Sequence, residues 1–449
     1  MSSSPRDPNT KLSALLAQAE CQRQELARAV NRIARTSGVP LNYSGQTVSM
    51  WLRGHEPKAQ VKPLVLAALS EKCGRPITHA EAGLTPPSDA DGSQQLDTVE
   101  QLLNLGRADM DPSRRGVLAA GAFSAAIAVP VFGTSPARAN ESVSPGKQTT
   151  RVGASQVASV RRTTARIADI LDEDGAGHAR PMAAAYLVNT VSPWLRAQAA
   201  TDVASSMRAA ASDLVYLTGW MAMYEADHAA AQRWYLKALA LADEAGDHVT
   251  YCRTLRGMSL QMTSLRKGSR GLEFADAAAE AAPAAGPRLV AFLRGQQAHA
   301  ASMVKDHRQA RVRLREAEDA LAKADNRRDA VGGYDRTAWL FHLSHVLMEA
   351  NDLPGSIKAL QDSIKVQPPQ ERQGRVHSYA LLAQRQLQLG HVDASAASWR
   401  RFLDEYEQVS SVRGDEHFQT MRKDMLRHQK ARSVRELSVR AREVAALKA

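Results

Sequence analysis

Three observations predict an all-α protein. No window of the 449 residues alternates apolar and polar side chains as a half-buried strand does, and from Val157 onward apolar residues recur at helical spacing. Ala is abundant while Phe, Trp and Tyr make up 5% of the chain, which favours closely packed helices over β-sandwiches. Apolar content of 44% and charged content of 23% are typical of soluble globular proteins.

The chain divides into three predicted parts. Residues 9–84 form a compact helical unit, 85–156 form a linker, and 157–449 form a long array of helices. The linker is polar and poor in large apolar side chains, except in an Arg-Arg apolar segment at 113–137. The array carries the small residues at helix crossings that an α-solenoid of paired helices requires.

The first part contains four expected helices, at 11–19, 24–35, 46–53 and 61–72. In the third of these, Val48 and Trp51 face inward and Gly54 ends the helix. Its outward face carries small polar groups and an Arg, which suit the DNA major groove, since Gln can recognise adenine and Arg can recognise guanine. The candidate DNA-binding residues are Gln46, Thr47, Ser49, Met50, Arg53, His55 and Lys58.

Two motifs carry a family resemblance in this part. Gln24–Ala27 reads QELA and Thr47–Gly54 reads TVSMWLRG. Both resemble the repressor-type helix-turn-helix family, which implies a DNA-binding domain over residues 9–84. The turn between the two helices is about ten residues long here, against the usual three or four. The alternative is a helical cap or protein-binding bundle that uses the same packing.

The net charge of +11 is distributed unevenly. Residues 1–84 hold 11 Lys and Arg against 6 Asp and Glu, and residues 422–442 hold 8 against 2. Such segments suit an anionic partner, yet they also occur on solvated helix faces. Flanking cations of the first part, Arg28, Arg32 and Lys62, are predicted to lie near phosphates, which add affinity rather than specificity. The stretch at 422–442 has no accompanying motif, and its role stays unassigned.

The Arg-Arg segment has three interpretations. Ser113–Leu118 resembles a twin-arginine export signal, and Ala137–Ala139 has the form of an A-x-A cleavage site. Residues 116–137 contain no charged side chain but are poor in large aliphatics and are interrupted by Pro130. The segment is therefore an apolar helix docked on the protein, a single-pass anchor with the N-terminus in the cytoplasm, or an export signal.

The array resembles degenerate tetratricopeptide repeats over about residues 212–402. Each of five helix pairs carries small residues at the expected crossing and a larger apolar residue between them. The second-helix positions are Ala231, Tyr235 and Ala238; Gly271, Ala275 and Ala278; Ala310, Leu314 and Ala317; Ser356, Leu360 and Ser363; and Ser395, Trp399 and Phe402. Helices at 157–172 and 182–200 are expected to cap one end, and helices at 416–447 the other.

Solenoids of this kind bind peptides or protein segments in a concave groove formed by their first helices. The candidate partner-groove residues are Tyr216, Arg253, Arg256, Gln297, His342, His345 and Tyr379. His342 and His345 share a face, but no carboxylate or Cys accompanies them at ligand spacing, so we expect no metal. We also expect no cofactor and no enzyme, because phosphate-binding loops, nucleophile elbows and paired Cys motifs are missing.

The order of these parts resembles actinomycete regulators, including negative regulators of Streptomyces development and antibiotic production. That resemblance implies a transcriptional regulator whose repeat domain binds a peptide or protein partner. We expect it to bind double-stranded DNA as a homodimer. The three cysteines, Cys21, Cys73 and Cys252, are too scattered for a disulfide framework, so a cytoplasmic location is expected. The alternative is a tetratricopeptide adaptor without DNA activity, membrane-tethered or exported through the Arg-Arg segment.

Overall fold

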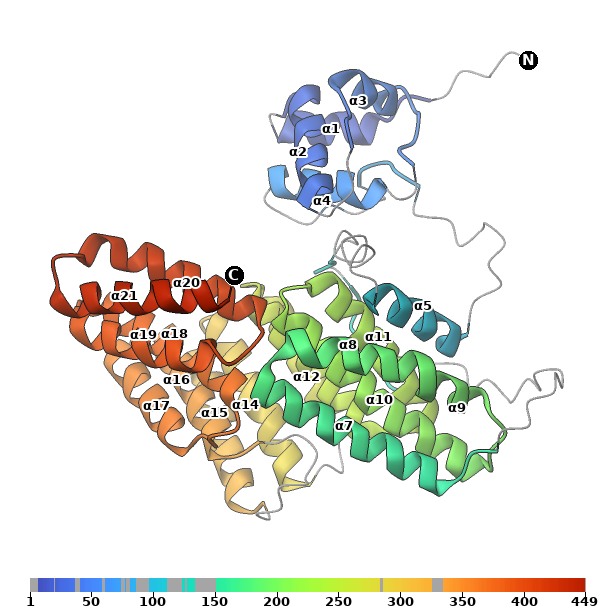
Figure 1. Ribbon diagram of the computed structural model, residues 1–449. Coiled ribbons are helices and arrows are strands. Elements are labelled where there is room, and N and C mark those ends of the chain that lie inside the picture. The colour runs from blue at the N-terminus through green and yellow to red at the C-terminus, as the bar shows by residue number, and fades with distance from the viewer. Residues whose placement is uncertain are drawn as a thin grey trace, which may run out of the picture. The chain divides into compact units, whose positions relative to one another are not determined.

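The regular secondary structure of the described residues is helical (Figure 1). The computed structural model describes residues 7–19, 21–36, 41–58, 61–73, 77, 81–85, 97–110, 123–125, 127–133, 151–282, 286–324 and 334–448. In these ranges the one β-type pairing is an isolated bridge between Arg151 and Gln198. The chain divides into two compact units, residues 1–128 with 228–230, and residues 129–227 with 231–449.

The N-terminal unit contains the four predicted helices, each within one residue of its expected bounds. They are α1 (Thr10–Gln18), α2 (Arg23–Thr36), α3 (Gly45–Leu52) and α4 (Lys62–Cys73), and α5 (Thr98–Met110) follows them. The first four share one core, in which Leu12, Leu26, Val48 and Leu69 are fully buried. Apolar side chains recur every three to four residues, and burying that face is what fixes these short helices.

The repeat unit begins with a pair of helices that differs from the expected cap. α7 (Ala154–Asp174) agrees with the prediction at 157–172. The helix expected at 182–200 is present and runs from residue 176 to residue 196, as α8 (Ala176–Tyr186), a π-helical turn (Leu187–Val191) and α9 (Ser192–Arg196). The backbone stays right-handed helical at Leu187 and Ser192, so the π-helical turn is a bulge inside one helix, which the sequence did not predict.

Five helical hairpins follow, and consecutive helices pack as in an α-solenoid. They are α10 (Thr201–Tyr224) with α11 (His228–Ala245), α12 (His248–Ser264) with α13 (Gly268–Glu280), α14 (Pro287–Met303) with α15 (His307–Ala322), α16 (Arg336–Glu349) with α17 (Leu353–Val366), and α18 (Arg372–Gln388) with α19 (Val392–Tyr406). The chain continues with α20 (Val412–Met425), a 3₁₀ turn (Leu426–His428) and α21 (Arg432–Leu447).

The turn inside each hairpin has the same backbone geometry. The second residue after the first helix adopts a positive φ. The N–H of the residue after it donates a hydrogen bond to the carbonyl five positions back, as in a Schellman motif. The positive-φ residues are Ala226 (56°), Arg266 (58°), Lys305 (66°), Asn351 (63°) and Gly390 (80°). Only the last of these is glycine. The other four adopt a left-handed conformation that is strained for their residue types and that the sequence does not predict.

Small side chains hold the two helices of a hairpin close together, as the sequence predicted. Ser356 Oγ donates to Ser344 O at 2.7 Å, and the same bond, twelve residues apart, recurs from Ser395 to Ala383 O at 2.8 Å. A Cβ on Gly219 would lie 2.8 Å from Cδ1 of Tyr235, so that crossing has no room for a side chain.

The two ends of the repeat unit contact each other. Ser410, between α19 and α20, donates its N–H to Asp174 O at 2.8 Å and accepts from Gly177 N–H at 3.0 Å. At the start of α20, the Arg413 guanidinium lies over the Tyr224 ring, 5.4 Å from its centroid. We call these interactions the closing contact. It brings the two ends of the array together, and side chains on the first helices such as Arg256 and His342 are buried.

The described part of the Arg-Arg segment is not helical. Residues 113–122 and 134–137 lie outside the described residues, and 123–125 and 127–133 have no helix, so the docked-helix prediction is wrong there. The segment is nevertheless docked on the repeat unit: the Phe132 ring lies 3.9 Å from that of His248, and Gly133 N–H donates to Asp243 Oδ1 at 2.6 Å. Among the described residues, none of the helices combines the length and the apolarity that crossing a bilayer requires.

Candidate functional site

The position of α3 is fixed by polar contacts from α2. Gly45 N–H, at the start of α3, donates to Gln24 Oε1 at 2.7 Å. Asn31 accepts from Tyr43 N–H at 2.8 Å and donates to Tyr43 O at 2.7 Å, which fixes the segment leading into α3. The Tyr43 ring packs edge-on against Trp51 at 5.6 Å. α2 therefore determines which face of α3 points to solvent.

Three candidate DNA-binding residues form one exposed stripe along α3. Gln46, Met50 and Arg53 are four and then three residues apart, so they share a helix face, and all three are exposed. Arg53 makes no ion pair with any residue that the structure describes. We call these three residues the α3 stripe. Its side chains combine a neutral amide, an apolar thioether and a cation.

The other four candidates have different environments. Thr47 accepts from Ser44 N–H at 3.5 Å, and Ser49 Oγ donates to Gly45 O at 2.9 Å. Both hydroxyls are thus used inside the helix itself. His55 is half-buried and Lys58 is exposed, both in the loop after α3. The sequence therefore placed all seven residues together, but the structure brings only three to the solvent face of the helix.

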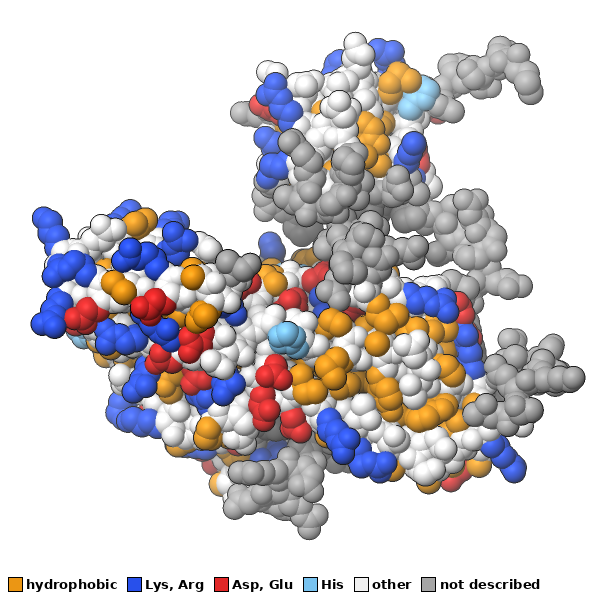
Figure 2. All heavy atoms as spheres, viewed as in Figure 1, with side chains coloured by type: hydrophobic (Ala, Val, Ile, Leu, Met, Phe, Trp, Pro, Cys, Tyr) orange, Lys and Arg blue, Asp and Glu red, His pale blue; other side chains and the backbone are white. Residues whose placement is uncertain are grey.

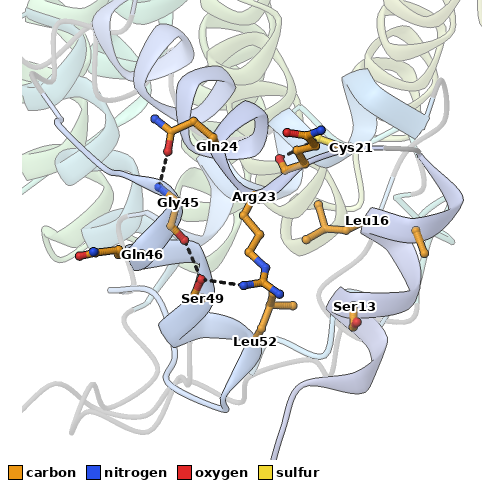
Figure 3. A pocket seen from close by; sticks show the side chains of 11 residues that line it. Ser13, Leu16, Cys21, Arg23, Gln24, Gly45, Gln46, Ser49 and Leu52 are labelled. Atoms are coloured by element: carbon orange, nitrogen blue, oxygen red, sulfur yellow. Dashed lines mark hydrogen bonds between the residues drawn. The ribbon is translucent and has the colours of Figure 1, made fainter.

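A hollow of about 770 Å³ lies beside the stripe, between α1 and the N-terminal turns of α2 and α3 (Figure 3). Arg23 reaches across it and donates to Ser49 Oγ at 3.3 Å, and Gln46 stands at its edge. Cys21 lines it but is buried, and burial raises the pKa of its thiol, which keeps the sulfur protonated. The polar lining and the cation suit a phosphate-bearing surface rather than a covalent reaction.

Lys62, one of the cations predicted to lie near phosphates, is not exposed to solvent. Lys62 is buried, forms an ion pair with Glu56 and donates to Thr85 O at 2.9 Å. Burial by itself would raise the pKa of Glu56, but hydrogen bonds from Lys62 and Thr85 outweigh it and lower that pKa. Lys62 thus joins α4 to the end of the unit and cannot reach a phosphate, contrary to the prediction. Arg28 and Arg32 are exposed on α2.

The basic stretch at 422–442 covers parts of α20 and α21, where Lys and Arg side chains gather (Figure 2). Two of its arginines are paired, Arg432 with Glu436 at 2.8 Å and Arg440 with Glu407 at 2.6 Å. The remaining basic residues of the stretch are exposed: Arg422, Lys423, Arg427, Lys430, Arg435 and Arg442.

Most of the predicted partner-groove residues lie in the interior of the repeat unit. Four of the seven are buried: Tyr216, Arg256, Gln297 and His342. The other three, Arg253, His345 and Tyr379, are half-buried. Two of the seven face second helices instead of the inner side: Gln297 bonds Asp276 on α13, and Tyr379 packs against the core cluster that includes Trp399 and Phe402 of α19.

Several of these side chains have close polar or aromatic neighbours. Arg253 donates to Asp213 Oδ1 at 2.5 Å and lies over the Tyr216 ring. Gln297 donates to Asp276 Oδ1 at 2.7 Å. His342 Nδ1 is 3.1 Å from Tyr334 Oη.

Sequence reasoning missed several interior residues. His299 on α14 lies beside His345, with 4.5 Å between ring centroids. His377 on α18 and His417 on α20 share a hydrogen bond of 2.9 Å. Arg385 on α18 is buried. His299, His377 and Arg385 stand on helices that were already assigned to the groove, where helical spacing was the available signal, whereas His417 stands on α20, which was expected to cap the array.

The interior imidazoles are neutral near pH 7. Burial, and next to it the Arg256 guanidinium, lowers the pKa of His299 to about 4. Burial and the positive charge of Arg413 lower the pKa of His417 to about 4. The pKa values of His342, His345 and His377 are also well below the usual range, with burial as the main cause. In the part of the chain that the structure describes, no group of three or more His, Cys, Asp or Glu residues is arranged to hold a metal ion.

The comparisons concern the N-terminal unit alone. A family model described as the SP15 N-terminal domain matches residues 12–85, which contain most of α1 and all of α2–α4. The chain is similar to that family over these residues. No curated protein matches the sequence.

Proposed function

We propose that the protein is a DNA-binding transcriptional regulator whose repeat unit binds a peptide or protein partner. The observation that supports it best is the α3 stripe, which presents Gln46, Met50 and Arg53 on one exposed face while Gln24 secures the start of the helix. A short helix held in this way, with an amide and a guanidinium pointing outward, suits base recognition in the major groove.

Exposed cations around the stripe supply the complementary contacts. Arg28 on α2 and Lys58 after α3 are exposed, and Arg23 spans the hollow beside Gln46. Phosphate contacts of this kind fix the register of a protein on a duplex and make its affinity salt-dependent. The similarity of QELA and TVSMWLRG to the helix-turn-helix family supports the same proposal, as does the wider resemblance to actinomycete regulators.

The proposed mechanism couples the two units through a dimer. Two copies would place two α3 helices about 34 Å apart, one turn of DNA, on a pseudo-palindromic site. A partner that binds one conformation of the repeat unit more tightly than another would shift the population toward it. DNA affinity would change if the two conformations differ in the spacing or freedom of their N-terminal units.

The test is a double substitution on the α3 stripe. Genome-wide mapping of DNA occupancy first identifies a site, and gel shifts at several salt concentrations then compare specific with nonspecific duplexes. We expect Gln46→Ala with Arg53→Ala to lose about 100-fold in affinity for the specific site, since each lost base contact is worth about 1–3 kcal/mol. The matched control is Gln309→Ala with Arg313→Ala, the same two changes on α15. A doubly substituted stripe that still shifts the specific duplex normally contradicts the proposal.

A second candidate is an adaptor that binds proteins and has no DNA activity. The regularity of the five hairpins favours it, since repeated helix pairs are a common scaffold for peptide recognition. In that case the wild-type protein would bind all duplexes equally and weakly, with affinity that disappears at physiological salt. The gel shifts above separate the two candidates before any substitution is made.

A further inference from the structure

Two arginines in the interior of the repeat unit have no anionic partner. Arg256 on α12 is 6% exposed and Arg385 on α18 is 4% exposed. The Nε and Nη1 atoms of Arg256 have no hydrogen-bond acceptor. Arg385 reaches only Ser344 O, at 3.5 Å. Neither guanidinium forms an ion pair with any residue that the structure describes.

The surroundings hold these cations without neutralising them. The Arg256 guanidinium lies over the rings of Phe292, at 4.2 Å, and Trp220, at 5.5 Å. Such contacts attract a cation but remove no charge. Two of the nearby carboxylates have other partners, since Asp213 pairs with Arg253 and Glu349 pairs with both Arg266 and Lys305. A third, Asp172 on α7, forms no ion pair among the described residues, and burial raises its pKa to about 7, so it offers Arg256 little negative charge.

A row of imidazoles connects the two arginines. His299 on α14 is 8% exposed, and its Nδ1 has no hydrogen-bond partner. Its ring lies 4.5 Å from that of His345 and 6.2 Å from that of His342, both on α16. We call Arg256, His299, His342, His345 and Arg385 the inner row. It crosses four successive first helices, α12, α14, α16 and α18.

Elsewhere in the same unit, buried arginines are paired. Arg180 contacts Asp227 at 3.0 Å, and Arg375 binds Glu405 through two nitrogens, at 2.8 and 2.9 Å. A buried unpaired charge is costly, and an arginine cannot relieve that cost by losing its proton. Arg256 and Arg385 thus differ from the other buried arginines of the unit, which have carboxylate partners. A bound anion would give them such partners too.

We propose that the inner row is the binding site for an acidic peptide, whose carboxylates pair with Arg256 and Arg385. This rests on the partner-binding part of the proposed function and names the chemistry of the partner. In chain order α14 and α16 come between the helices that carry the two arginines, and His299 on α14 feels the charge of both guanidiniums. Two carboxylates spaced along one extended peptide suit two such cations at the two ends of a row.

Entry of such a peptide requires the closing contact to open. That contact can be weakened without touching the inner row, because a Cβ on Gly177 would lie 2.3 Å from Ser410 Oγ and 3.0 Å from Ser410 Cβ. Gly177→Val therefore forces Ser410 away from α8. The proposal predicts that this variant binds the peptide faster than the wild-type protein does.

The probe is a fluorescein-labelled decapeptide of alternating Glu and Ala, titrated into the full chain without DNA and followed by anisotropy. We expect Arg256→Met and Arg385→Met each to weaken binding about tenfold or more, as the loss of a charge-assisted hydrogen bond implies. The matched control is Arg313→Met on α15, whose guanidinium is half-buried and already pairs with Glu316, so this change should alter affinity less than about twofold. Without peptide, Arg256→Met should raise the thermal midpoint, because it removes an unpaired buried charge.

Several results would overturn the proposal. Equal affinity of wild type, Arg256→Met and Arg385→Met would show that the peptide binds other cations of this basic chain. An alternating Lys and Ala decapeptide that binds as tightly would rule out charge recognition. Inorganic phosphate that raises the thermal midpoint as much as the Glu peptide would indicate a compact-anion site. Since no DNA is present, these outcomes are independent of whether the chain binds an operator.

Discussion

The N-terminal unit and the repeat unit differ in where they keep their polar side chains. In the first, the described core consists of Leu, Val and Ala with Cys21, Trp51 and Ile77, and the described cations other than Lys62 are exposed. In the second, the interior holds Arg256, Arg385, His299, His342 and many Ser, Thr and Gln residues. An exposed arginine such as Arg53 can be recognised from the sequence as a candidate ligand contact. A buried arginine such as Arg256 cannot, because its burial depends on the fold. The predictions that follow test this difference, beginning with the largest expected effect.

Acid should destabilise the repeat unit and spare the N-terminal unit. Burial lowers the pKa of His299 to about 4, and His342, His345 and His377 shift in the same direction. The unfolded chain binds these protons below about pH 6.5. The stability from these histidines is therefore present above that pH and is lost as the pH falls from 6.5 toward 4, at about 1.4 kcal/mol for each unit of pKa shift. Burial raises the pKa of Asp172 to about 7, so its protonation in the same window offsets part of this loss.

Hydrogen exchange at several pH values, corrected for intrinsic rates, measures this effect for each unit. Peptides from α14, α16 and α18 should lose protection between pH 6 and pH 4.5, while those from α2 and α3 keep it. His299→Gln should reduce the acid sensitivity, and His178→Gln, a change at an exposed residue, should leave it unaltered. Equal loss of protection in both units would contradict the comparison.

Trp51→Ala tests the apolar core of the N-terminal unit. Trp51 is 4% exposed and packs on Tyr43, so its removal should cost about 3–5 kcal/mol, a large fraction of the stability of a small domain. We expect α1–α4 to lose hydrogen-exchange protection while the thermal midpoint of the repeat unit is unchanged. The neighbouring exposed substitution Met50→Ala should cost less than about 0.5 kcal/mol. Loss of both units together in Trp51→Ala would show that they do not fold independently.

The repeat unit should be sensitive to the opposite change, from small to large. Gly219→Ala places a Cβ 2.8 Å from Cδ1 of Tyr235, and because the ring is itself buried we expect a loss of about 1–3 kcal/mol in denaturant unfolding. The control is Gly374→Ala, where the nearest atom is the end of the flexible Gln367 side chain. That change should be neutral or slightly stabilising. Equal costs for the two would mean that the tight crossing does not limit the packing.

The sequence sufficed for features that depend on local periodicity. The four helices of the N-terminal unit were predicted within one residue because Leu12, Leu26, Val48 and their neighbours repeat at helical spacing. The hairpins were found because small residues such as Gly219 and Ser356 mark each crossing. The π-helical turn at 187–191 was missed, since its residues fit an ordinary helix equally well.

Features that depend on distant contacts could not be predicted. The closing contact joins Asp174 to Ser410 across more than half of the chain, and neither residue marks it in the sequence. Without that contact, Arg256 and His342 are expected on an open surface, which is where the sequence placed them. For the same reason His299 and Arg385 were overlooked, because a polar residue on a helix is ordinarily solvated.

The smallest expected effect concerns the hairpin turns. Ala226 has a φ of 56°, a conformation that costs an L-residue about 1–2 kcal/mol and glycine almost nothing. Ala226→Gly removes this backbone strain, but glycine also has greater conformational freedom in the unfolded chain, which offsets part of the stabilisation. The net effect on the repeat unit should be a stabilisation of about 0.5–1 kcal/mol. The control, Ala320→Gly inside α15, should cost about 1 kcal/mol. Denaturant unfolding of both variants gives the comparison, and a loss of stability in Ala226→Gly would show that the methyl group contributes more by packing than the backbone strain costs.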